Sequence, residues 1–95
     1  EYSDAIHRLT LAAQGAPEDA TVFNNFAVAY LSRARVALRA GDHAQAERDW
    51  LAAQNYARKY QIAGQGDPRF NALLDQVERQ GAKWGFHSEP AAPRR

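Results

Sequence analysis

The chain has 95 residues and a mass of 10.6 kDa, which is one small domain's worth of polypeptide and leaves room for a single core. Hydrophobic residues make up 45% and charged residues 24%, a globular balance that excludes a wholly disordered chain. The net charge of +1 gives no support to nucleic-acid binding. Without cysteine, the chain forms no disulfide and no cysteine-based metal or catalytic site.

No run approaches the roughly 18 apolar residues that a membrane span needs, and the first residues lack the features of a signal peptide. We therefore expect no membrane partner. Because the chain starts at Glu1 and contains no methionine, we expect it to be a processed product or a piece of a longer protein. Its compartment is left open.

Helix formers dominate the sequence, since alanine is the commonest residue and glycine and proline occur in a few places only. Apolar residues spaced by three and four predict helices at about 2–14, 19–40, 43–62 and 68–80. Asp42 and Asp67 are the predicted N-caps of the last two helices. The predicted fold class is all-α, built from antiparallel helical hairpins.

The predicted helical domain covers residues 1–84, and residues 85–95 are predicted to form a flexible tail rich in proline and arginine. Two aromatic residues at this boundary, Trp84 and Phe86, are the exceptions that could dock on the fold.

Two segments of the chain match one another with an offset of 41 residues, from Tyr2 to His43. Each has a ring residue, a small residue three on, a large apolar residue four on and a small residue three on. The two sets are Tyr2, Ala5, Leu9, Ala12 and His43, Ala46, Trp50, Ala53. We expect the two helices that carry them to play the same structural part.

The segment between these helices carries an aromatic, a second large apolar residue, a small residue and a tyrosine, namely Phe23, Phe26, Ala27 and Tyr30. This pattern resembles the first helix of a tetratricopeptide repeat. Residues 41–53 resemble the turn and second helix of that family, and residues 2–17 resemble the end of a preceding repeat. The resemblance implies a small α-solenoid of about four helices.

The offset exceeds the family's period of about 34 residues by about seven, and the excess falls between Tyr30 and Gly41. Seven residues are almost two helical turns and rotate the helix face by only about 20°, so we expect one elongated helix at 19–40. A HEAT-type repeat, with a period of about 40 to 47 residues, is the structural alternative.

In the resembled family, the first helices of the repeats line a concave groove that binds an extended peptide or a partner's helix. The resemblance therefore implies a non-catalytic protein–protein interaction scaffold that binds through residues 19–40. The candidate partner-binding residues are Asn24, Asn25, Val28, Ser32, Arg35 and Arg39.

Asn25 is the first choice among them, because an amide offers a donor and an acceptor to a peptide backbone and the family commonly has asparagine at the matching place. Arg33, Arg35 and Arg39 form a basic stretch able to pair with acidic groups of a partner. No lysine or arginine lies between Arg8 and Arg33, so the family's clamp for a C-terminal carboxylate is not expected.

Catalysis finds little support, because the three histidines lie on separate elements and no HExxH, GxSxG or phosphate-binding motif occurs. His43 with Glu47, and Asp4 with His7, could each place two ligands on one helix face, but two ligands do not make a metal site. We expect no catalytic residue, metal or cofactor.

A protein or peptide is the expected partner. With so few repeats the groove would be shallow, which suggests flanking repeats in a parent chain or self-association. Two alternatives therefore stay open: a docking or regulatory appendage of a larger enzyme, and a homo-oligomerisation module.

Overall fold

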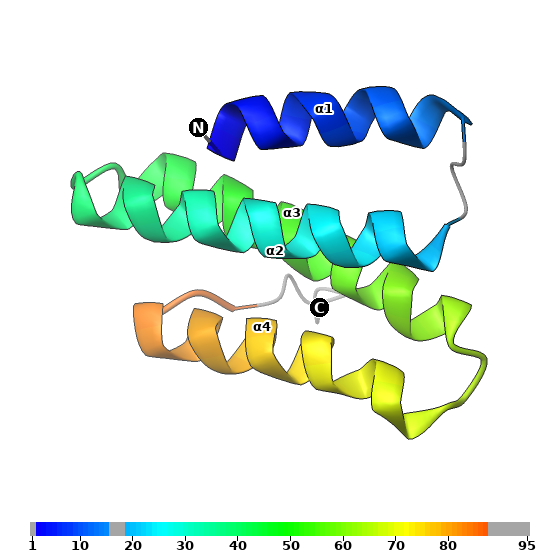
Figure 1. The fold of residues 1–95 in the computed structure, drawn as a ribbon. Helices are drawn as coiled ribbons and strands as arrows, with labels where there is room; N and C mark the ends of the chain where they lie inside the picture. The colour runs from blue at the N-terminus through cyan, green and yellow to red at the C-terminus, as the bar shows by residue number, and fades with distance from the viewer. Residues whose placement is uncertain (1, 16–18, 88–95) are drawn as a thin grey trace, which may run out of the picture.

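The computed structural model describes residues 2–15 and 19–87, and these form four α-helices and one turn of 3₁₀ helix (Figure 1). The elements are α1 (Tyr2–Gly15), α2 (Ala20–Arg39), α3 (His43–Ala63), η1 (Pro68–Asn71) and α4 (Ala72–Trp84). No strand occurs within the described ranges. The predicted all-α class is thereby confirmed, and the helix bounds agree closely except for the fourth helix, where a 3₁₀ turn replaces the predicted first turn and the helix continues to Trp84.

Each helix packs against its neighbour in sequence and runs antiparallel to it (Figure 1). The α2–α3 hairpin is the centre of the molecule, with α1 on α2 and α4 on α3. The expectation of one elongated helix needs correction, because α2 has 20 residues and α3 has 21. The turn between them extends beyond the ends of α1 and α4 (Figure 1).

Aspartates begin three of the helical elements. The side chain of Asp19 accepts a hydrogen bond from the Thr21 backbone N–H at 2.8 Å, and Asp42 accepts one from Gln45 at 3.1 Å. Asp67 caps η1 through the Arg69 N–H at 2.9 Å, so the predicted cap at Asp42 is confirmed, whereas Asp67 caps the 3₁₀ turn that precedes α4 and Asn71 is the N-cap of α4 itself. Each such cap stabilises a helix by about 1 kcal/mol, which favours these start points over their neighbours.

Two buried clusters form the core of the described residues. The first joins α1 to α2 through Ile6, Val22, Phe26 and Ala29. The second joins α2, α3 and α4 and consists of Ala27, Leu31, Ala34, Trp50, Ala53, Ala57, Leu74 and Val77. The four alanines of this cluster are small and have no exposed surface, so the α2 and α3 backbones approach closely where they meet.

A stack of aromatic rings connects the two clusters. Tyr56 of α3 lies 4.5 Å from the Phe26 ring and 5.9 Å from the Tyr30 ring, both nearly parallel to it. Burial, followed by the neighbouring Tyr56, raises the pKa of the Tyr30 hydroxyl. Ring pairs at these distances stabilise by about 0.5–1.5 kcal/mol beyond their buried area.

Trp50 fixes α4 on α3. Its indole Nε1 donates a hydrogen bond to the Val77 carbonyl at 2.8 Å, and a Cβ at Gly81 would lie 2.2 Å from the indole ring. Gly81 is therefore a glycine of close approach inside α4, where the sequence predicted the helix to end at about residue 80. The helix ends instead at Trp84 and is capped by Gly85, which has a left-handed φ of +85°.

The reversal at Gly85 returns the chain to the core. Phe86 donates its backbone N–H to the Gly81 carbonyl at 2.7 Å, and its ring lies 5.9 Å from Trp50 and 6.1 Å from Trp84. The domain boundary drawn at residue 84 thus separates Phe86 from the cluster in which it packs. The rest of the predicted tail, residues 88–95, lies outside the described residues.

Gly81→Ala is expected to destabilise the fold. Overpacking against the buried indole costs about 1–3 kcal/mol, which exceeds the gain of about 1 kcal/mol in helix propensity. Urea unfolding followed by circular dichroism measures the difference, with exposed Gln76→Ala in the same helix as the control. A more stable Gly81→Ala protein would contradict the close approach of α4 to Trp50.

Candidate functional site

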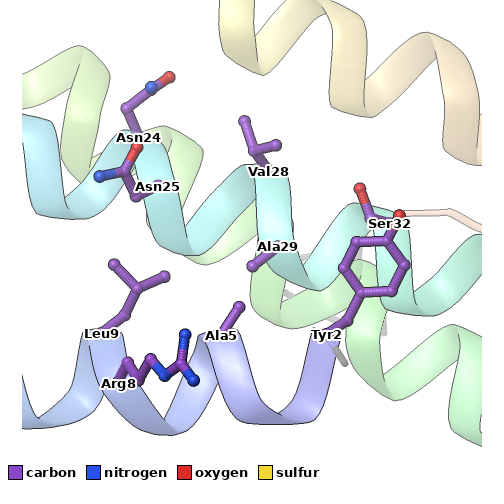
Figure 2. A pocket seen from close by; sticks show the side chains of 9 residues that line it. All are labelled: Tyr2, Ala5, Arg8, Leu9, Asn24, Asn25, Val28, Ala29 and Ser32. Atoms are coloured by element: carbon purple, nitrogen blue, oxygen red, sulfur yellow. The ribbon is translucent and has the colours of Figure 1, made fainter.

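An open groove of about 590 Å³ lies between α1 and α2 (Figure 2). Helix α1 contributes Tyr2, Ala5, Arg8 and Leu9, and α2 contributes Asn24, Asn25, Val28, Ala29 and Ser32. The two helices run antiparallel, so Leu9 lies across from the asparagines, Ala5 across from Ala29, and Tyr2 beside Ser32 (Figure 2). Apolar side chains therefore line the middle of the groove, and polar groups are present at both ends.

The groove forms because α1 packs against α2 along one side only. Ile6 is buried in the cluster shared with α2, whereas Ala5 and Leu9 are half-buried and Arg8 is exposed. On α2, Ala29 is buried, while Val28 is 50% exposed and Asn25 is also exposed. Within the groove, Val28 thus exposes apolar surface next to the amides of Asn24 and Asn25 and the Arg8 guanidinium.

Four of the six predicted partner-binding residues line this groove: Asn24, Asn25, Val28 and Ser32. The other two lie elsewhere on α2. Arg35 is half-buried with its guanidinium 5.8 Å from the centre of the Trp84 ring, on the side of α2 that faces α4. Arg39 is exposed in the last turn of α2, beyond the part of the helix that α1 covers.

The sequence analysis missed the α1 side of the groove. Tyr2, Ala5 and Leu9 were identified only as part of a repeated helical pattern, and Arg8 was assigned to no site. Their spacing does show that Tyr2, Ala5 and Leu9 share a face. Which half of that face stays open depends on how α1 lies on α2, and a single helix does not contain that information.

Arg33 has a structural role in place of the predicted partner-binding one. Its Nε donates to Asp49 Oδ2 at 3.0 Å and its Nη2 to Asp49 Oδ1 at 2.9 Å, a two-point ion pair between α2 and α3. Its Nη1 also donates to Ser3 Oγ of α1 at 3.0 Å. Gln45 donates a further hydrogen bond to Asp49 at 2.9 Å, so the carboxylate is well satisfied although its side chain is 2% exposed.

This ion pair keeps Arg33 charged and unavailable. The hydrogen bond to Asp49 is the main cause that raises the pKa of the Arg33 guanidinium, against the opposing effect of burial. A guanidinium held at two points by a carboxylate has few donors left for a partner.

Replacing Arg33 with methionine is expected to destabilise the protein by about 3 kcal/mol, because it leaves the buried Asp49 carboxylate without its counter-charge. Asp49→Leu should cost less, since the guanidinium it frees is 28% exposed and reaches water. The Arg33→Met/Asp49→Leu double variant should cost least, because an apolar pair replaces a buried ion pair. Urea titrations of the three variants give the order, and exposed Arg58→Met serves as the control. An Asp49→Leu cost above that of Arg33→Met would contradict it.

The described residues contain no group of three or more histidine, aspartate or glutamate side chains placed to hold a metal ion. None of the helices in the described ranges combines the length and apolar character needed to cross a membrane. Comparison of the chain with models of known protein families, with curated proteins and with solved structures found no match. The groove is therefore interpreted from the side chains that line it.

Substitutions of the groove residues on α2 are expected to affect stability much less than substitutions in the core. Asn25→Ala and Val28→Ala should change the free energy of unfolding by less than about 0.5 kcal/mol, because both side chains are exposed. Phe26→Ala, one residue from Asn25 but 4% exposed, should cost about 3–5 kcal/mol. Thermal unfolding distinguishes them. A loss in Asn25→Ala as large as that in Phe26→Ala would place the asparagine in the core.

Proposed function

We propose that this chain is a non-catalytic interaction module, similar to a tetratricopeptide repeat, that binds a peptide segment of a protein partner in the groove between α1 and α2. The observation that carries the proposal is the groove itself. It is open, and it places the exposed Val28 and the half-buried Leu9 beside the amides of Asn24 and Asn25. Apolar contact area together with donors and acceptors is what a peptide requires for affinity and orientation.

The antiparallel order of the helices supports the resemblance to tetratricopeptide repeats. Helices α1 and α3 both pack against α2, in keeping with the matching pattern of Tyr2, Ala5, Leu9 and His43, Ala46, Trp50. In such an arrangement α2 presents its free face to a partner, and α1 and α3 support it. The candidate residues Asn25, Val28 and Ser32 lie on that free face at spacings of three and four.

A peptide selection tests the proposal. A displayed library of random 12-residue peptides is selected against the intact chain, and the dissociation constants of the enriched peptides are measured by fluorescence polarisation. The Asn25→Ala/Val28→Ser variant should bind them about ten-fold more weakly, because it removes an amide contact and part of the apolar surface.

Leu51→Ser is the matched control for this test. Leu51 is an exposed apolar residue of α3, 37% exposed, and it does not line the groove. Its replacement should leave peptide affinity unchanged. Peptides that bind both variants as tightly as the parent would contradict the groove as the binding site.

Light scattering of the same samples distinguishes peptide binding from the main alternative, which is self-association. A chain that stays monomeric from micromolar to millimolar concentration leaves the groove free for peptides. A tight dimer that selects no peptide would favour self-association instead, for which exposed apolar residues such as Val36, Leu11 and Ile62 are available.

A further inference from the structure

The arginines around the groove divide into two that serve the fold and two that do not. Arg33 pairs with Asp49, and Arg35 stacks on Trp84. Arg8 and Arg39 are both exposed, and within the described residues neither makes a hydrogen bond, ion pair or ring contact. Two guanidinium groups of this kind on one surface form a charge pattern that a partner can complement.

Arg8 lies within the groove and Arg39 lies in line with it. Arg8 is one of the residues that line the groove, and Figure 2 shows its side chain running along α1 between Leu9 and Ala5. Arg39 follows Ser32 by seven residues, almost two full turns, so it lies on the same face of α2 as the groove residues. No aspartate or glutamate of the described residues lines the groove to neutralise this charge.

The polar groups of the groove favour an extended segment over a helix. A helix satisfies its own backbone N–H and C=O groups, and so has little use for the amides of Asn24 and Asn25. An extended strand has unpaired backbone donors and acceptors along its length, and asparagine side chains can meet both kinds.

The spacing of the two arginines sets the spacing of their counter-charges. Arg8 lies across from the stretch between Asn25 and Val28, which is 11 to 14 residues before Arg39. At about 1.5 Å per helical residue this is about 17–21 Å. An extended peptide covers that distance in about five or six residues at about 3.3 Å each.

We infer that the occupant of this groove is an extended, acidic peptide segment with two carboxylate side chains about five or six residues apart, one paired with Arg8 and the other with Arg39. The inference rests on the proposed function, and it specifies the partner's charge, conformation and length.

Matched peptide libraries test the inference. One set of 14-residue peptides carries two fixed glutamates separated by four or five random residues, and a second set carries glutamines at the same two places. A third set places the glutamates only two residues apart. All are amidated at the C-terminus, and one copy of the first set has a free C-terminal carboxylate.

The widely spaced glutamate set is expected to bind most tightly. Each Glu→Gln change should weaken binding about five-fold, and raising the salt from 0.05 M to 0.5 M should remove most of that difference. Arg8→Glu and Arg39→Glu should each weaken binding by at least that factor. Arg79→Glu on α4 changes the net charge equally and should have no such effect, because α4 does not pack against α1.

Three other outcomes would overturn the inference, and they differ in what else they imply. Peptides that depend on Val28 but tolerate both arginine variants and both glutamines would leave the proposed function standing and remove the acidic partner. Enhancement only by the free C-terminal carboxylate would replace internal acids with a chain end. Failure of every library to give Val28-dependent binding would remove the proposed function and the inference together.

Discussion

Close approach of α2 and α3 is the constraint on which the rest of the structure depends. Ala27 and Ala34 of α2 and Ala53 and Ala57 of α3 have no exposed surface and share one buried cluster. Side chains this small let two helices of about 20 residues lie close together, and Tyr56 can then reach the aromatic rings of α2. Helices α1 and α4 are each added to one partner of this hairpin.

The groove follows from this unequal arrangement. Helix α1 packs on α2 through Ile6 and its neighbours, so the other side of the α1–α2 contact stays open. Val28 can remain exposed there without loss of stability, because the α1–α2 cluster beside the groove and the cluster shared with α3 and α4 supply the burial.

Charge has two separate uses in this chain. Arg33 and Asp49 form a largely buried pair that links α2 to α3, with Ser3 of α1 hydrogen-bonded to the same guanidinium. One side chain thereby connects three helices, which suits arginine because its five donors have fixed directions. Arg8 and Arg39 remain solvated, and a solvated guanidinium can pair with a partner at low desolvation cost.

Local features of the sequence were sufficient for the secondary structure. Apolar spacing, aspartate caps and glycine turns act within a few residues, so the all-α class, the start of α3 at Asp42 and the start of the helical segment after Asp67 could be predicted. The α2 side of the groove could also be predicted, since Asn25, Val28 and Ser32 share a face by periodicity alone.

Only the tertiary structure decided the rest, because the deciding contacts join residues far apart in the chain. Gly81 reads locally as a helix end, and the Trp50 ring against it makes it a packing position instead. Arg33 reads as a surface charge until Asp49 meets it, and Arg8 belongs to no site until α1 lies beside α2. Helical periodicity determines which residues share a face, whereas the relative placement of two helices determines which of those faces stays open.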